Sequence, residues 1–119
     1  MLHHVSIEVP PEAAERFGAM LTLIGFAEVE APPELGGQIP WYEHGGTQVH
    51  LIVTEAATVP VLGHAAFVAR DFEADVAALE AAGFQVDEHQ QLWGEPRGFI
   101  QAPGGHKVEL MAAPPEPSV

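Results

Sequence analysis

The chain repeats itself once, and this repeat constrains its fold more than any other feature of the sequence. HHVSIEV near the start corresponds to GHAAFVA in the second half, LIGFAEVE corresponds to AAGFQVDE, and GGTQVHLIV corresponds to GGHKVELMA. The paired anchors lie 58 to 60 residues apart: His4 and His64, Gly25 and Gly83, and Gly45 and Gly104. A shared spacing at three separate places predicts two copies of one supersecondary unit.

Each half has the pattern of a strand, a helix and three further strands. Apolar residues recur at helical spacing in the stretch 11–24, which Gly25 is expected to end. Asp71 is expected to cap the second helix, and Gly45-Gly46 is a hairpin signal. The expected strands are 2–9, 26–30, 40–44 and 47–54 in the first half, and 62–69, 84–88, 97–101 and 107–112 in the second. The sequence therefore predicts an α+β fold of two βαβββ modules, each a half-barrel curved sheet with its helix on the convex side.

Length and composition fit one domain. The chain has 119 residues, of which 47% are hydrophobic, and it contains no cysteine. We expect a single domain over residues 1–113, with modules at about 1–54 and 62–113, held together by its core rather than by disulfides. Residues 114–119 are rich in proline and predict a short flexible tail.

The charge is strongly unbalanced. Four Lys and Arg face 17 Asp and Glu, for a formal net charge of −13. Such a surface repels nucleic acids and anionic membranes. There is no apolar stretch long enough to span a bilayer and no secretory signal at the start, so we expect a cytoplasmic protein.

Four polar residues lie on the strand faces that the apolar residues leave free. They are His4, His50, His64 and Glu109. His4 and His64 are equivalent in the repeat, as are His50 and Glu109. Imidazole nitrogens and a carboxylate suit Fe(II), Mn(II), Ni(II), Co(II) or Zn(II), so we expect a metal site where the four meet. The alternative is a metal-free cavity that merely contains polar residues, and His3 is expected on the opposite face, in solvent.

Four segments resemble the vicinal oxygen chelate superfamily, which includes glyoxalase I, methylmalonyl-CoA epimerase, extradiol dioxygenases and fosfomycin- and bleomycin-resistance proteins. These are HHVSIEV, TQVHLIV, GHAAFVARD and RGFIQAPGGHKVELM, and the resemblance covers the chain to about Ala113. It implies metal ligands at His4, His50, His64 and Glu109. His50 departs from the Glu or Gln of the isomerase branches, which argues against glyoxalase I or an epimerase. Ala102-Pro103 replaces the usual Asp-Pro.

The resemblance implies a divalent-metal-dependent enzyme that acts on a small oxygenated metabolite as an isomerase, lyase or dioxygenase. Glu109 or His50 would move the proton, and Trp41, Trp93 and Arg97 would contact the substrate; Tyr42 is a further candidate for the cavity wall. The alternative is a metal-free protein that sequesters a small molecule, as bleomycin-resistance proteins do. A homodimer is expected because half-barrels need a partner, with the modules pairing either within one chain or across two.

Overall fold

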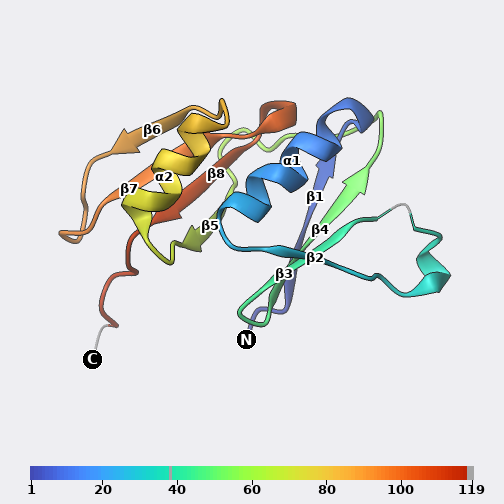
Figure 1. The fold of residues 1–119 in the computed structure, drawn as a ribbon, viewed down its shortest axis with the longest axis horizontal. Coiled ribbons are helices and arrows are strands. Elements are labelled where there is room, and N and C mark those ends of the chain that lie inside the picture. The colour runs from blue at the N-terminus through green and yellow to red at the C-terminus, as the bar shows by residue number, and fades with distance from the viewer. Residues whose placement is uncertain (38, 118–119) are drawn as a thin grey trace.

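The computed structural model describes residues 1–37 and 39–117, and it contains two four-stranded sheets and two α-helices (Figure 1). The first module comprises β1 (His4–Val9), α1 (Pro11–Leu23), β2 (Ala27–Val29), β3 (Trp41–His44) and β4 (Thr47–Val53). The second comprises β5 (Ala65–Val68), α2 (Phe72–Ala81), β6 (Val86–His89), β7 (Arg97–Gln101) and β8 (Lys107–Met111). Short 3₁₀ helices, η1 (Pro33–Leu35) and η2 (Pro103–Gly105), lie in the connections. The predicted α+β fold of two βαβββ modules is confirmed, and neither sheet closes into a barrel.

Both sheets have the same topology, with strand orders β1-β4-β3-β2 and β5-β8-β7-β6. The first and last strands of each module run parallel, which brings Ser6 opposite His50 and Ala66 opposite Glu109. The other neighbours are antiparallel. The repeat therefore places the ligand-type residues on adjacent strands of each sheet.

The helices begin and end where the sequence predicts. The Asp71 side chain accepts a hydrogen bond of 3.1 Å from the backbone N–H of Ala74, as an N-cap should. At the end of α1, Gly25 has a φ of 108°, and the N–H of Phe26 donates to the carbonyl of Leu21. Only glycine adopts this conformation without strain, so the helix turns sharply into β2.

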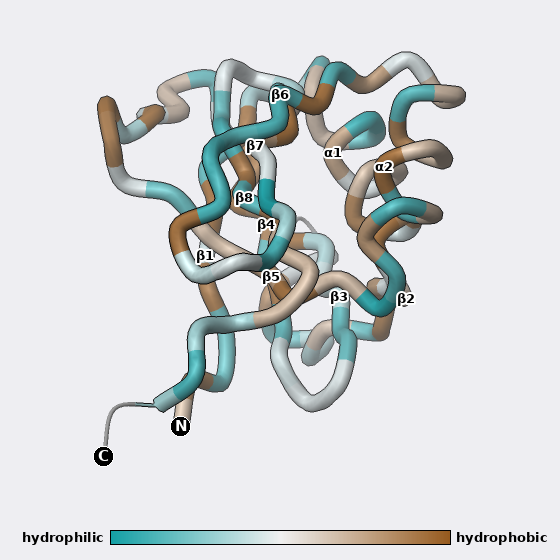
Figure 2. Tube along the Cα trace, turned by 90° about the vertical axis from the view of Figure 1, so that its left-hand side faces the viewer, coloured by the Kyte–Doolittle hydropathy of each residue, from teal (hydrophilic) through white to brown (hydrophobic). Residues whose placement is uncertain are grey.

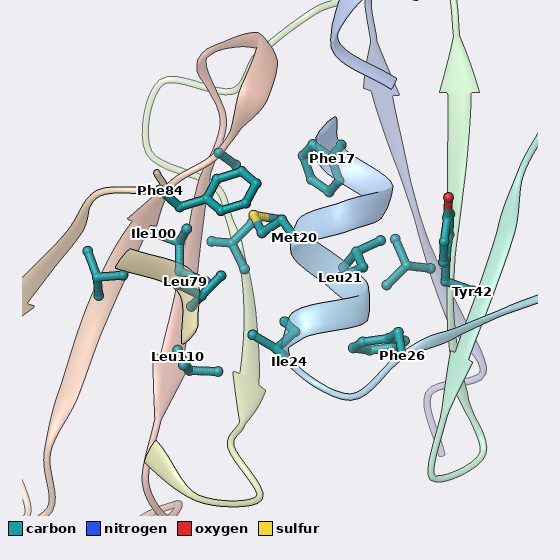
Figure 3. Close-up of a cluster of buried hydrophobic side chains, with 14 of the residues drawn as sticks. Phe17, Met20, Leu21, Ile24, Phe26, Tyr42, Leu79, Phe84, Ile100 and Leu110 are labelled. Atoms are coloured by element: carbon teal, nitrogen blue, oxygen red, sulfur yellow. The ribbon is translucent and has the colours of Figure 1, made fainter. Parts of the chain in front are cut away.

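One hydrophobic core joins the two modules, and α1 lies at its centre. Figure 3 shows the apolar side chains of α1 between two groups, one from each module. The α1 residues are Phe17, Met20, Leu21 and Ile24, the second module supplies Leu79, Phe84, Ile100 and Leu110, and the first supplies Phe26 and Tyr42. In Figure 2 both helices lie on the same side of the molecule, with hydrophobic and hydrophilic segments alternating along them. The packing fixes the two sheets relative to each other.

Polar contacts across the modules reinforce this packing. Arg16 of α1 donates to the carbonyl of Ala82 at the end of α2, at 3.1 Å. Arg70 of the second module donates to the carbonyl of Leu23 at the end of α1, at 3.2 Å. Each arginine thus satisfies a carbonyl that the opposite module's helix leaves without an internal partner. The buried His106 adds a third contact, because its Nε2 donates to the Glu8 carbonyl at 2.6 Å.

Two expectations need comment. The fifth strand was expected from Leu62, but it begins at Ala65; Leu62 is 85% exposed, and its carbonyl bonds the ring of His64 instead of a neighbouring strand. The end of the expected tail, residues 118–119, lies outside the described residues, so its flexibility stays a prediction. In the part of the chain that the structure describes, no helix is long and apolar enough to cross a membrane.

Gly18 offers a test of the α1 packing. A methyl group there would run into the hydroxyl end of Tyr42, which packs against the helix. Alanine is normally about 1 kcal/mol better than glycine inside a helix. We nevertheless expect Gly18→Ala to lower the free energy of unfolding by about 1–3 kcal/mol, measured by urea denaturation. The exposed neighbour gives the control, since Ala19→Gln should change stability by less than about 0.5 kcal/mol. A more stable Gly18→Ala protein would contradict this packing.

Candidate functional site

The four predicted metal ligands form two pairs, one on each sheet. In the first sheet the rings of His4 and His50 stack with centroids 4.1 Å apart and planes at 19°. In the second, His64 Nε2 lies 2.9 Å from Glu109 Oε1. Within residues 1–37 and 39–117, no three His, Asp or Glu side chains are grouped so that they could hold a metal ion. One chain therefore does not bring the four residues to a common point.

His50 is the most constrained member of the first pair. It is buried, with 7% of its surface exposed, and it is sandwiched between His4 and Trp41, whose ring stacks on it at 4.0 Å and 4°. Burial, and then the neighbouring His4 and His3, lower the pKa of His50. His50 is therefore held as a neutral imidazole, the form that binds metals or accepts protons.

His3 was expected on the opposite face, in solvent; it is exposed as predicted, but it lies beside His4 and not on the opposite face. It lies before β1, where strict alternation no longer applies, and its Nδ1 is 2.9 Å from Nδ1 of His4. Its ring also lies 6.5 Å from that of His50. The first sheet thus carries three imidazoles close together.

The second pair lies among hydrogen-bond acceptors. The Nδ1 of His64 donates to the Leu62 carbonyl at 2.9 Å, while its Nε2 faces the Glu109 carboxylate. Because both ring nitrogens face acceptors, the pKa of His64 is raised, first by the bond to Leu62 and then by Glu109. Glu109 is buried, and its other oxygen lies 3.5 Å from the guanidinium of Arg97. These contacts favour the protonated form of the His64 ring.

The three residues expected to contact the substrate are divided between the two pairs. Trp41 belongs to the first, where it stacks on His50. Arg97 belongs to the second, and its guanidinium lies 5.9 Å from the ring centroid of Trp93. The indole N–H of Trp93 donates to the Ala113 carbonyl at 2.8 Å. Tyr42, expected in the cavity wall, lies in the core instead, because its neighbour Trp41 takes the other face of β3.

Two further residues belong with these pairs and were missed. Phe99 lies on the same face of its sheet as Arg97, with its ring 4.9 Å from that of His64. Gln48, two residues before His50 on β4, lies within hydrogen-bond distance of the His50 ring. Strand alternation already placed both on the polar faces, so the signal was present in the sequence.

The faces that carry the pairs are open to solvent. Ile52 and Val68, which follow His50 and His64 on their faces, are 36% and 49% exposed. A cleft of about 450 Å³ runs between the modules, and His64 lines it together with Ser6 of β1. The cleft therefore gives His64 access to solvent between the modules.

Comparison with known proteins finds similarity in the fold and not in the sequence. No family model matches the chain, and no curated protein does. Among solved structures, a glyoxalase family protein from Bacillus anthracis is similar over 93% of both chains, with a TM-score of 0.82 and 23% identity. The oxidase ChaP-H2 is similar over 97% of this chain and 94% of its own, with a TM-score of 0.76 and 16% identity. A bleomycin resistance determinant encoded on the transposon Tn5 covers 90% of this chain and 94% of its own, with a TM-score of 0.63 and 14% identity.

The ion pair of His64 and Glu109 predicts a pH-dependent stability. A raised folded-state pKa stabilises the protein below the unfolded value, near 6.5, and this contribution is lost as the pH rises through the folded pKa. We expect Glu109→Gln to lower the pKa of His64, measured by NMR titration. Its loss of stability should be larger by up to about 1 kcal/mol at pH 6 than at pH 8.5. Glu88→Gln, an exposed change on β6, should leave the His64 titration unchanged. An unshifted His64 in Glu109→Gln would contradict the pairing.

Proposed function

We propose that this chain, which has the fold of the glyoxalase, bleomycin-resistance and dioxygenase proteins, is a divalent-metal-dependent enzyme acting on a small oxygenated metabolite. We further propose that it acts as a homodimer. The observation that carries both proposals is the pairing of ligand-type residues at repeat-related positions on two open sheet faces. Each pair supplies half of a metal site.

The donor chemistry of the two halves fits a divalent transition metal. His4 and His50 would contribute neutral imidazoles, and His64 and Glu109 would contribute an imidazole and a carboxylate. This set suits Fe, Mn, Ni, Co or Zn, and the proton on His64 Nε2 would have to leave first. The lowered pKa of His50 favours the neutral ring that metal binding needs, whereas the raised pKa of His64 opposes it.

A homodimer completes the site in this proposal. His4 and His50 of one protomer would face His64 and Glu109 of its partner, and the reverse pairing would give a second, equivalent site. The uncovered Ile52 supports this arrangement, because it lies on the sheet face that would be closed. The core around α1 supports it too, because it fixes the modules of one chain in an orientation that keeps the pairs apart.

The residues beside the site have distinct roles in the proposed reaction, which is of the isomerase, lyase or dioxygenase type. A bound divalent ion would supply Lewis acidity toward adjacent substrate oxygens. His50 would accept a substrate proton at a ring nitrogen, or Glu109 would accept it at a carboxylate oxygen. Trp41 and Trp93 would form apolar walls, and Arg97 would meet a single negative charge on the substrate. A cytoplasmic location belongs to the same proposal.

A second candidate is sequestration of a small molecule without chemistry. The net charge of −13 favours it, because an acidic protein with aromatic residues on its open faces suits a cationic ligand. The similarity to the Tn5 bleomycin resistance determinant concerns the fold alone. Metal dependence separates the two candidates.

Metal analysis is the first test. We expect protein purified without added metal to bind one divalent ion per chain, and His64→Ala to weaken Co²⁺ affinity by more than about 100-fold, measured by calorimetry. His44→Ala gives a matched control, since the His44 ring packs against Phe26 at 5.6 Å, outside both pairs. Undiminished affinity in His64→Ala would reject the ligand set. If the parent protein binds no divalent ion at micromolar concentration, the sequestration candidate replaces the enzyme.

Mixing two damaged proteins tests whether the site spans two protomers. His50→Ala damages only the first half-site and Glu109→Ala only the second. A heterodimer of the two carries one intact site, in which the undamaged halves meet. After denaturation and joint refolding at equal amounts, we expect about a quarter of the parent's Co²⁺ sites, whereas each variant refolded alone has none. Sites contained within one chain would give no recovery on mixing.

A further inference from the structure

Glu43, Gln48 and His50 form a row of polar side chains on one face of the first sheet. β3 and β4 pair so that Trp41 lies opposite His50 and Glu43 lies opposite Gln48, all on the same face. We propose that Glu43 and Gln48 are positioning residues, which fix the ring nitrogen that carries the proton of His50 and leave the other free for a ligand. The hydrogen bonds of this row carry the assignment of the protonated nitrogen of His50. Its meaning for ligand binding rests on the proposed function.

The direction of each hydrogen bond follows from Glu43. Its ionised carboxylate can only accept, so the amide group that faces it, at 2.9 Å, must be the Nε2 of Gln48. The Gln48 oxygen then faces His50 Nε2 at 2.8 Å, and an amide oxygen also only accepts. His50 Nε2 must therefore be the protonated nitrogen. In the neutral ring this leaves the lone pair on Nδ1.

Stacking fixes the plane of the His50 ring but not which of its two flipped orientations it adopts. Gln48 selects one of the two. Trp41 and His4 hold the two faces of the ring at 4.0 Å and 4.1 Å, which fixes its plane. A half-turn about the Cβ–Cγ bond keeps the ring in that plane but exchanges Nε2 with Cε1 and Nδ1 with Cδ2. Only one of the two orientations gives Gln48 an N–H to accept. The row thus selects both the ring orientation and the tautomer.

The consequence is that His50 presents Nδ1 to a metal or to a substrate proton. Metal-binding histidines commonly donate their other N–H to an oxygen that orients the ring, and Gln48 supplies that oxygen. On the second sheet the Nδ1 of His64 donates to Leu62 and its Nε2 faces Glu109, so His64 would offer Nε2 once that nitrogen has lost its proton. The two halves of the proposed site therefore differ in the nitrogen that they offer.

NMR of the metal-free protein tests this assignment directly. Long-range ¹H–¹⁵N correlations distinguish the two histidine tautomers, and His50→Gln identifies the signals of His50. We expect an Nε2–H ring in the parent protein and a mixture of tautomers in Gln48→Leu. Gln101→Leu makes the same change on β7, where the side chain bonds Asp87, and should leave His50 unaffected. An Nδ1–H ring in the parent, or an unchanged ring in Gln48→Leu, would overturn the proposal.

A Co²⁺ titration separates this inference from the proposed function. We expect Gln48→Leu to weaken Co²⁺ binding by about 10–100-fold, with Gln101→Leu close to the parent. Equal affinity in Gln48→Leu and the parent would overturn the role of Gln48 in binding. If the parent binds no Co²⁺, the proposed function fails, whereas the tautomer measurement still decides whether Glu43 and Gln48 position His50.

Discussion

The packing of α1 against both modules is the constraint on which the rest of the structure depends. Its apolar face supplies the centre of the one core, so the first sheet cannot move without disturbing the second module. Arg16 and Arg70 then connect each module to the last carbonyls of the other module's helix. An isolated curved sheet with one helix buries too little apolar surface to be stable, and sharing α1 removes this deficit.

The same packing determines which face of each sheet carries the candidate site residues. The contacts of α1 commit one side of each sheet to the core, and the imidazoles and the carboxylate lie on the other side. The arginines are largely used by the fold: two hold the modules together and Arg97 approaches Glu109. Of the four basic residues, Arg16, Arg70 and Lys107 are exposed, and they lie in separate segments of the chain. This distribution disfavours a substrate with several negative charges, which agrees with the absence of a cationic patch in the sequence.

Much of the fold could be predicted from the sequence because its signals are local and occur twice. The glycines after each helix, the Asp71 cap and the alternation of the strands each depend on a few neighbouring residues. The sequence identified the four residues but predicted that they would meet at one point; their division into two pairs comes from the structure. What could not be predicted depends on the angle between the modules. The separation of the pairs follows from the α1 packing, and the place of His3 follows from backbone outside β1, where no alternation applies.

Duplication within one chain lets the two halves of the proposed centre differ, since His50 has been retained at one copy of a position and Glu109 at the other. Two identical modules would have to repeat the same pair of ligands. Three neutral imidazoles and one carboxylate around a dication would leave one unit of positive charge at the ion. The proposed metal centre would then carry positive charge inside a protein that is strongly acidic overall. A singly charged anion would be repelled by the protein surface and attracted once it reaches the metal.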